Sequence, residues 1–197
     1  ANHTDGILVL GTTGESSTMT HEEDDAVVEF TLKVINKRLP VIVGAGSNCT
    51  QTAVEKSIKY EKMGADYLLI ISPYYNKANN QGMIAHFTAV ADAVNIPIIM
   101  YNISGRTGVA ISEDAVKVLS KHPNICGIKE ASGNISYATN IARYLNDDFA
   151  MYSGNDDMIT SMLSLGASGV ISVLANVLPK ETHDMVMDYL NGDVKNH

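Results

Sequence analysis

Short apolar segments alternate with longer amphipathic segments along the whole 197-residue chain. The apolar segments are rich in Ile, Val and Leu and are continuous, which is typical of parallel strands covered on both faces. Seven of them occur, at residues 6–11, 40–46, 66–72, 97–102, 125–130, 149–154 and 169–174. The pattern therefore predicts seven parallel strands.

The segments between these strands have helical spacing. Residues 21–38 begin directly after Thr20, which matches a capping box together with Glu23, and residues 50–63 are followed by Gly64, a common helix stop. The expected apolar face of the first helix consists of Ala26, Val27, Phe30, Val34 and Ile35. Further helices are predicted over residues 81–94, 112–121, 136–145, 156–165 and 179–190.

Repeated strand–helix units predict a parallel α/β fold, either an open doubly wound sheet or a closed (β/α)8 TIM barrel. Nearly every strand ends in polar residues, and in a barrel every strand can deliver a group to one face. We therefore favour the barrel, with residues 1–197 as a single catalytic domain. A complete barrel needs roughly 250 residues. We expect this one to be incomplete at both ends, lacking the first strand–helix unit and the C-terminal helices.

Composition narrows the classes of function. Hydrophobic residues make up 45% of the chain, and 22 acidic against 14 basic residues give a net charge of −8. This acidity argues against nucleic-acid and anionic-membrane partners, and no long apolar run or signal peptide is visible. Cys49 and Cys126 form no CxxC pair, which favours a reduced, cytoplasmic protein.

The candidate nucleophile is Lys129, in the strand segment ICGIKE. Alternation on a strand places Gly127 and Lys129 on one face, and Cys126, Ile128 and Glu130 on the other. If Lys129 faces a barrel interior, with space left by Gly127, burial lowers the pKa of its amine. A neutral amine can form a Schiff base with a ketone. The alternative is a structural lysine paired with a carboxylate.

Two further strand ends offer matching chemistry. The turn Thr12-Thr-Gly-Glu15 provides hydroxyls and backbone N–H groups that could hold a carboxylate, and Tyr101 provides a phenol for proton transfer. Each has an ordinary structural alternative, a polar turn or a rim tyrosine. Their convergence with Lys129 indicates a site for a 2-oxo acid.

Other chemistries lack their signatures. Gly44-Ala-Gly46 has no third glycine for a dinucleotide fingerprint, and the six histidines show no metal-binding spacing. Asp156 and Asp157 open a predicted helix and are interpreted as its cap. We expect no metal and no cofactor.

Five motifs together resemble the dihydrodipicolinate synthase family of pyruvate-dependent class I aldolases, which are (β/α)8 barrels. They are GTTGES at 11–16, PYYN at 73–76, YNxxxRTG at 101–108, KEASGN at 129–134 and SGND at 153–156. The resemblance covers essentially the whole chain. It implies condensation of pyruvate with L-aspartate 4-semialdehyde in lysine and diaminopimelate biosynthesis.

The resemblance also implies residue roles. Lys129 matches the lysine that binds pyruvate covalently, and Thr12, Tyr101 and Tyr75 match a proton-relay triad. Because Tyr75 matches a residue that reaches into the neighbouring subunit's site, a homodimer or homotetramer is implied. The expected substrate-binding residues are Thr13, Arg106, Gly154 and Ile171, with Arg106 binding the carboxylate of the semialdehyde.

The chain departs from the family pattern at two places. Ser104 replaces a proline before Arg106, which removes a fixed φ. Ser16, His21, Asn48 and Tyr74 fit the family's lysine-feedback site. However, Asp24 and Thr52 stand where lysine-inhibited relatives commonly have histidine and glutamate. We therefore expect weak or absent inhibition by lysine.

Two rival functions remain at this stage. Another aldolase of the same family would cleave sialic acid or a 2-keto-3-deoxy sugar acid, although such enzymes generally lack the RTG at 106–108. The other rival is an inactive barrel fragment that keeps the residues without a closed site.

Overall fold

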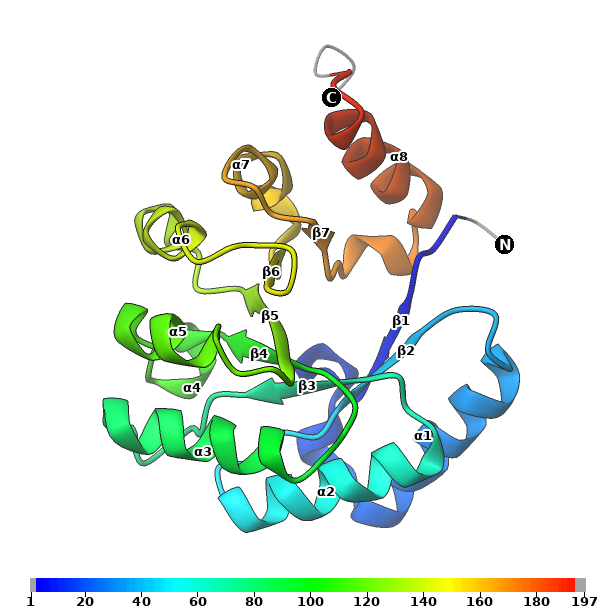
Figure 1. Ribbon diagram of the computed structural model, residues 1–197. Coiled ribbons are helices and arrows are strands. Elements are labelled where there is room, and N and C mark those ends of the chain that lie inside the picture. Colours follow the sequence, from blue (N-terminus) through cyan, green and yellow to red (C-terminus); the bar gives the residue numbers. More distant parts are fainter. Residues whose placement is uncertain (1–2, 194–197) are drawn as a thin grey trace.

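Seven parallel strands form one continuous sheet in the computed structural model, which describes residues 3–193. All seven predicted strands are confirmed, and they pair in chain order from β1 to β7 (Figure 1). Their bounds are β1 (Ile7–Val9), β2 (Val41–Gly44), β3 (Tyr67–Ile71), β4 (Ile98–Asn102), β5 (Ile125–Glu130), β6 (Ala150–Ser153) and β7 (Gly169–Val170).

Helices follow the strands as expected. They are α1 (His21–Ile35), α2 (Thr50–Met63), α3 (Asn80–Asp92), α4 (Ser104–Thr107), α5 (Glu113–Leu119), α6 (Ile135–Ala142), α7 (Ile159–Ser164) and α8 (Pro179–Leu190). Four 3-10 turns are η1 (Thr12–Gly14), η2 (Ser16–Thr18), η3 (Asp156–Met158) and η4 (Leu174–Asn176). The predicted capping box of Thr20 and Glu23 is formed, and Gly64 ends α2 at φ 106°. The sequence did not predict α4.

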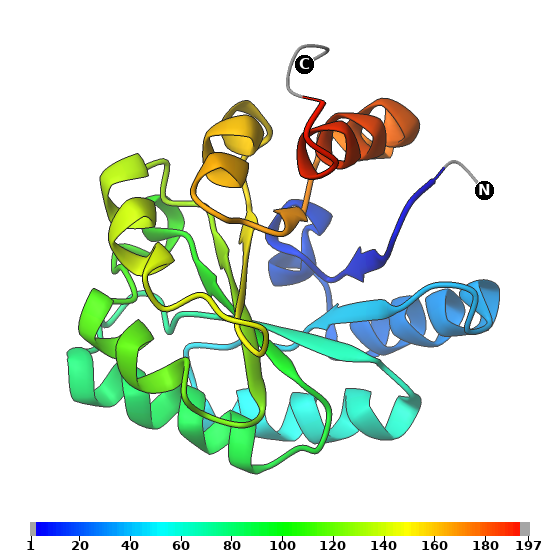
Figure 2. The ribbon, with the colours of Figure 1, turned by 45° about the horizontal axis from the view of Figure 1, so that its top comes forward.

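The sheet curls with its helices on the outside (Figures 1 and 2). Strand order β1 to β7 without reversal is the order of a barrel, so the doubly wound alternative is wrong. A large apolar cluster, which includes Leu68, Ile98 and Ile128, fills the space between sheet and helices. A smaller cluster around Leu69, Ile99 and Tyr101 lies on the concave face.

The sheet has two edges, β1 and β7, which pair with only one neighbour each among the described strands. Residues of β1, β7 and α8 line a cavity of about 980 Å³ that reaches the concave face of the sheet. The architecture is thus the (β/α) barrel expected from the sequence, with seven strands and an open seam (Figure 2).

The apolar face predicted for α1 is wrong in part. Phe30 and Val34 are 68% and 49% exposed, whereas Val28 and Asp24 are buried. The carboxylate of Asp24 accepts a hydrogen bond from Lys56 of α2 at 2.7 Å. The buried face of α1 therefore includes an ion pair with the neighbouring helix as well as the apolar contact of Val28.

No helix in the described range 3–193 has the length and hydropathy needed to cross a membrane.

Candidate active site

Lys129 lies next to the end of β5, flanked in register by Tyr101 of β4 and Tyr152 of β6. Its side chain lines the cavity and is only 7% exposed, with Nζ 4.4 Å from the centroid of the Tyr101 ring. Burial lowers the pKa of the Lys129 amine to about 8, and the charge of Asp156 opposes this shift. The partial desolvation expected from the sequence is confirmed. At neutral pH roughly a tenth of the amine is uncharged.

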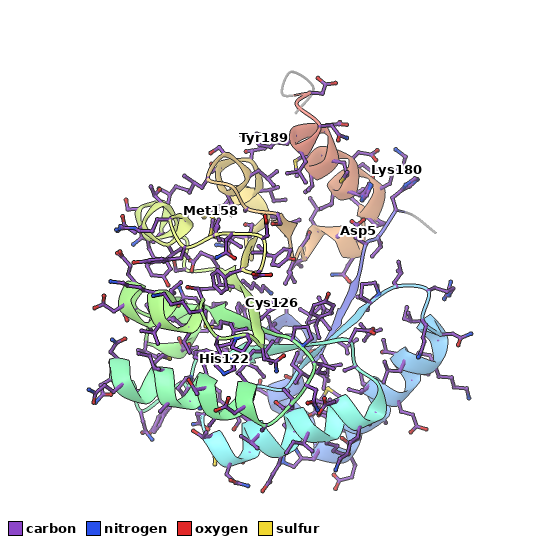
Figure 3. All side chains as sticks on the ribbon, viewed as in Figure 1. Asp5, His122, Cys126, Met158, Lys180 and Tyr189 are labelled. Atoms are coloured by element: carbon purple, nitrogen blue, oxygen red, sulfur yellow. The ribbon has the colours of Figure 1, made fainter. Side chains whose placement is uncertain are left out.

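A β-bulge determines which side chains of β5 lie on the same face of the sheet as Lys129. The register shifts between Ile98 and Ile99, so that Ile125 pairs with Ile98 and Gly127 with Ile99. The predicted grouping of Cys126 with Ile128 is therefore wrong. Cys126 packs against the inner cluster, whereas Ile128 packs outward. Cys126 lies in the middle of the molecule (Figure 3).

Gly127 is needed for a different reason than the one expected. A Cβ atom at this position would lie 2.6 Å from the carbonyl oxygen of Ala150 on β6. Its role is thus to allow close approach of the two backbones.

Tyr101 and Thr12 meet at the same end of the sheet. Tyr101 is 5% exposed, and burial raises the pKa of its phenol. A hydrogen bond with the side chain of Thr12 and the charge of Arg106 oppose that rise. The phenol is therefore protonated near neutral pH, and its contact with Thr12 gives it a partner for proton transfer.

The remaining pocket residues come from three loops. Thr13 and Ile171 line the cavity together with Lys129. The backbone N–H of Ile171 donates to the carbonyl of Ser153 at 2.9 Å, which fixes it beside β6. Gly154 follows β6 and packs its backbone against the side chain of Lys129.

Replacing Gly154 by alanine is expected to destabilise the protein by about 1–3 kcal/mol, since the added Cβ overpacks the core. That Cβ would lie 2.5 Å from the Cβ of Ala131 and 3.1 Å from Cε of Lys129. Urea unfolding followed by circular dichroism measures the loss. Gly105→Ala is the matched control, because a Cβ there meets nothing within 4 Å. Equal midpoints for the two variants would contradict the packing argument.

Arg106 and Tyr75 occupy the exposed rim rather than the cavity wall. Arg106 is exposed on the short helix α4, and its positive charge opposes the rise in the pKa of the Tyr101 phenol. Tyr75 is 81% exposed at φ 77°, a left-handed conformation that is strained for a tyrosine. Its backbone N–H donates to Thr107 at 3.4 Å, so the two rim loops are joined.

A buried polar network behind the site was missed by the sequence analysis. Glu130 is 3% exposed and accepts hydrogen bonds from the Asn102 amide at 2.6 Å and from the backbone N–H of Ser132 at 2.7 Å. The side-chain oxygen Oδ1 of Asn102 accepts a hydrogen bond from the backbone N–H of Ile111 at 2.9 Å. These bonds join the ends of β4 and β5 to the loop that carries Arg106. They constrain that loop although residue 104 is a serine, which lacks the fixed φ of a proline.

No cluster of three or more His, Cys, Asp or Glu side chains able to hold a metal ion occurs among residues 3–193.

Comparison with known proteins gives consistent matches over nearly the whole chain. The model of the dihydrodipicolinate synthetase family matches residues 1–197. A 4-hydroxy-tetrahydrodipicolinate synthase of Clostridium perfringens (strain SM101 / Type A) is 52% identical over 193 residues, which are 98% of this chain and 66% of that protein. The chain thus spans slightly less than two thirds of the length of this relative.

Solved structures agree with the sequence match. The crystal structure of dihydrodipicolinate synthase from Aquifex aeolicus superimposes with a TM-score of 0.94 at 44% identity, covering 98% of this chain and 66% of that one. The chloride-inhibited enzyme from Acinetobacter baumannii, complexed with pyruvate, gives a TM-score of 0.94 at 41% identity over the same shares.

Proposed function

The chain belongs to the dihydrodipicolinate synthetase family, and we propose that it condenses pyruvate with L-aspartate 4-semialdehyde through a Schiff base on Lys129. The observation that carries the proposal is the position of the Lys129 amine. It is buried, lines a cavity, and lies against the ring of Tyr101. The product would be 4-hydroxy-tetrahydrodipicolinate, formed for lysine and diaminopimelate biosynthesis.

The first step is attack by the neutral amine of Lys129 on the ketone carbon of pyruvate. A C–N bond forms, the ketone oxygen takes a proton, and loss of water gives a cationic iminium. Tyr101, protonated and in contact with Thr12, supplies and recovers these protons. Thr13 and the adjacent backbone hold the pyruvate carboxylate.

The second step uses the pyruvate methyl group. Loss of a methyl proton converts the iminium into an enamine, whose carbon attacks the aldehyde while the aldehyde oxygen takes a proton. The amino group of the semialdehyde then replaces Lys129 on the iminium carbon, which closes the ring and frees the enzyme. The one water lost overall leaves during the first step. Arg106, at the rim, binds the carboxylate of the semialdehyde in bidentate fashion.

We place Tyr75 in the site of a second copy, as the third member of the proton relay in a homodimer or homotetramer. Its 81% exposure and strained backbone support this role, because they hold a large ring away from its own chain.

The proposal needs no cofactor beyond the covalent pyruvate. It also places the protein in the cytoplasm, in keeping with the two unpaired thiols, Cys49 and Cys126.

Borohydride reduction in the presence of pyruvate tests the proposal. We expect a single reduced adduct, which peptide mass mapping assigns to Lys129. Absence of any adduct would favour the rival reading of an inactive fragment. Given an adduct, turnover of aspartate semialdehyde is compared with cleavage of sialic acid and of a 2-keto-3-deoxy sugar acid. Preference for a sugar acid would assign the chain to the other aldolases of the family.

Lysine is expected to bind this protein weakly, with a dissociation constant above about 1 mM. Asp24 is 1% exposed and ion-paired with Lys56, so its carboxylate is not free to bind the ammonium group of a ligand. Thr52, at the second divergent position, carries no charge. Isothermal titration of lysine into the protein measures the affinity.

The matched variant for the lysine experiment is Thr52→Glu, which restores the carboxylate that lysine-inhibited relatives commonly have. It should tighten lysine binding, whereas Thr52→Gln should not. Submillimolar binding by the unaltered chain would refute the expectation.

A further inference from the structure

Asp156 makes contacts that differ from the helix cap predicted for it. Its Oδ2 atom accepts hydrogen bonds from the backbone N–H groups of Val173 at 3.1 Å and Leu174 at 3.0 Å. It therefore caps the segment that follows β7 instead of its own turn. Its Oδ1 atom is buried and has no hydrogen-bond partner among the described residues. A buried carboxylate oxygen without a partner is costly unless another charge compensates it.

The chain path brings Asp156 to the same end of the barrel as Lys129. Ser153 pairs in register with Glu130, and the N–H of Gly154 donates to the carbonyl of Glu130 at 2.8 Å. A Cβ on Gly154 would lie 3.1 Å from Cε of Lys129. Asp156 begins η3 two residues later, and its charge acts on the Lys129 amine.

The other titratable groups facing this amine are neutral near pH 7. Burial raises the pKa of Tyr101 on β4 and of Tyr152 on β6. It also raises the pKa of Cys126, on the inner face of β5, to about 11. The cation Arg106 lies on the exposed rim, where it acts on Tyr101. Asp156 is thus the anion that balances the buried amine within residues 3–193.

We propose that Asp156 is the counter-ion of the Lys129 site. Its negative charge is fixed by the two backbone hydrogen bonds and stabilises Lys129 as the ammonium ion. On the proposed function, the same charge stabilises the cationic iminium formed with pyruvate. Asp156 is therefore a positioning residue that acts through charge, and it is not required to touch the substrate.

Competitive labelling of the protein with acetic anhydride between pH 6 and 10 tests this proposal, with Lys129 acetylation quantified by mass spectrometry. Asp156→Asn keeps the side-chain size and removes the charge. It should lower the labelling midpoint of Lys129 by about one pH unit, because loss of a nearby opposite charge favours the neutral amine. Asp157→Asn is the matched control, since the exposed neighbour carries the same formal charge. It should leave the midpoint unchanged.

An Asp156→Asn midpoint equal to that of the parent would overturn the proposal, as would an equal shift in Asp157→Asn. If Asp156→Asn unfolds the protein, the labelling midpoint of Lys129 moves the opposite way, toward about 10.4. The variant Asp156→Glu, which keeps the charge, is then used instead. A Lys129 midpoint in Asp156→Glu equal to that of the parent supports the proposal, and a lower midpoint overturns it. Labelling needs no pyruvate, so a chain that shows the shift but forms no pyruvate adduct contradicts only the proposed function.

Discussion

Replacing Lys129 by arginine is expected to abolish covalent capture of pyruvate. Arginine keeps the positive charge on a side chain of similar length, but its guanidinium does not lose a proton in proteins and cannot form a Schiff base. The lysine amine is different, because burial lowers its pKa to about 8. Mass mapping after borohydride reduction with pyruvate should find no adduct in the variant.

The matched control for this variant is Lys117→Arg, which changes an exposed lysine on α5. It should form the adduct at the parent's rate, and that rate should rise as the pH approaches about 8, where Lys129 loses its proton. An adduct that persists in Lys129→Arg would show that another amine reacts and would remove the basis of the mechanism.

Helices and strands were predicted well where the residues that specify them lie within the same short segment of the sequence. Helix α2 was predicted at its observed bounds, because Gly64 provides the left-handed residue that ends it. The seven apolar runs predicted seven strands, since a strand covered on both faces has no polar alternation. The polar strand ends likewise predicted that Lys129, Tyr101 and Thr12 converge.

Features that depend on contacts distant in the sequence were not predictable. The bulge in β5 turns Cys126 inward, and nothing in ICGIKE marks an extra residue against the register of β4. The exposure of Phe30 depends on what α1 packs against, which helical spacing alone does not specify.

The same limit applies to the polar residues around the site. Glu130 was recognised as a strand-end residue, but its buried bond to Asn102 depends on the register of β4 and β5. Asp156 follows a strand and precedes a helix, which is a usual place for a cap. Only the fold shows that its carboxylate binds the backbone after β7 instead.

Tyr101→Phe is expected to slow formation of the pyruvate adduct by about 10²–10⁴-fold, the usual loss when a positioned acid–base group is removed. The ring remains, so the packing of Tyr101 and its contact with the Lys129 amine at 4.4 Å are kept. What disappears is the hydroxyl that contacts Thr12. Rapid quenching with borohydride at a series of times measures the rate.

Tyr152→Phe is the control, because it removes the hydroxyl of the other tyrosine that flanks Lys129 in register. It should leave the rate within about twofold, the scale expected of a position without an acid–base role. Thr12→Val, alone and combined with Tyr101→Phe, then separates a relay from two independent contributions. In a relay the second substitution costs little once the first is made, since the two hydroxyls act as a unit. Fully additive losses, or an equal loss in Tyr152→Phe, would contradict a relay from Thr12 through Tyr101 to the substrate.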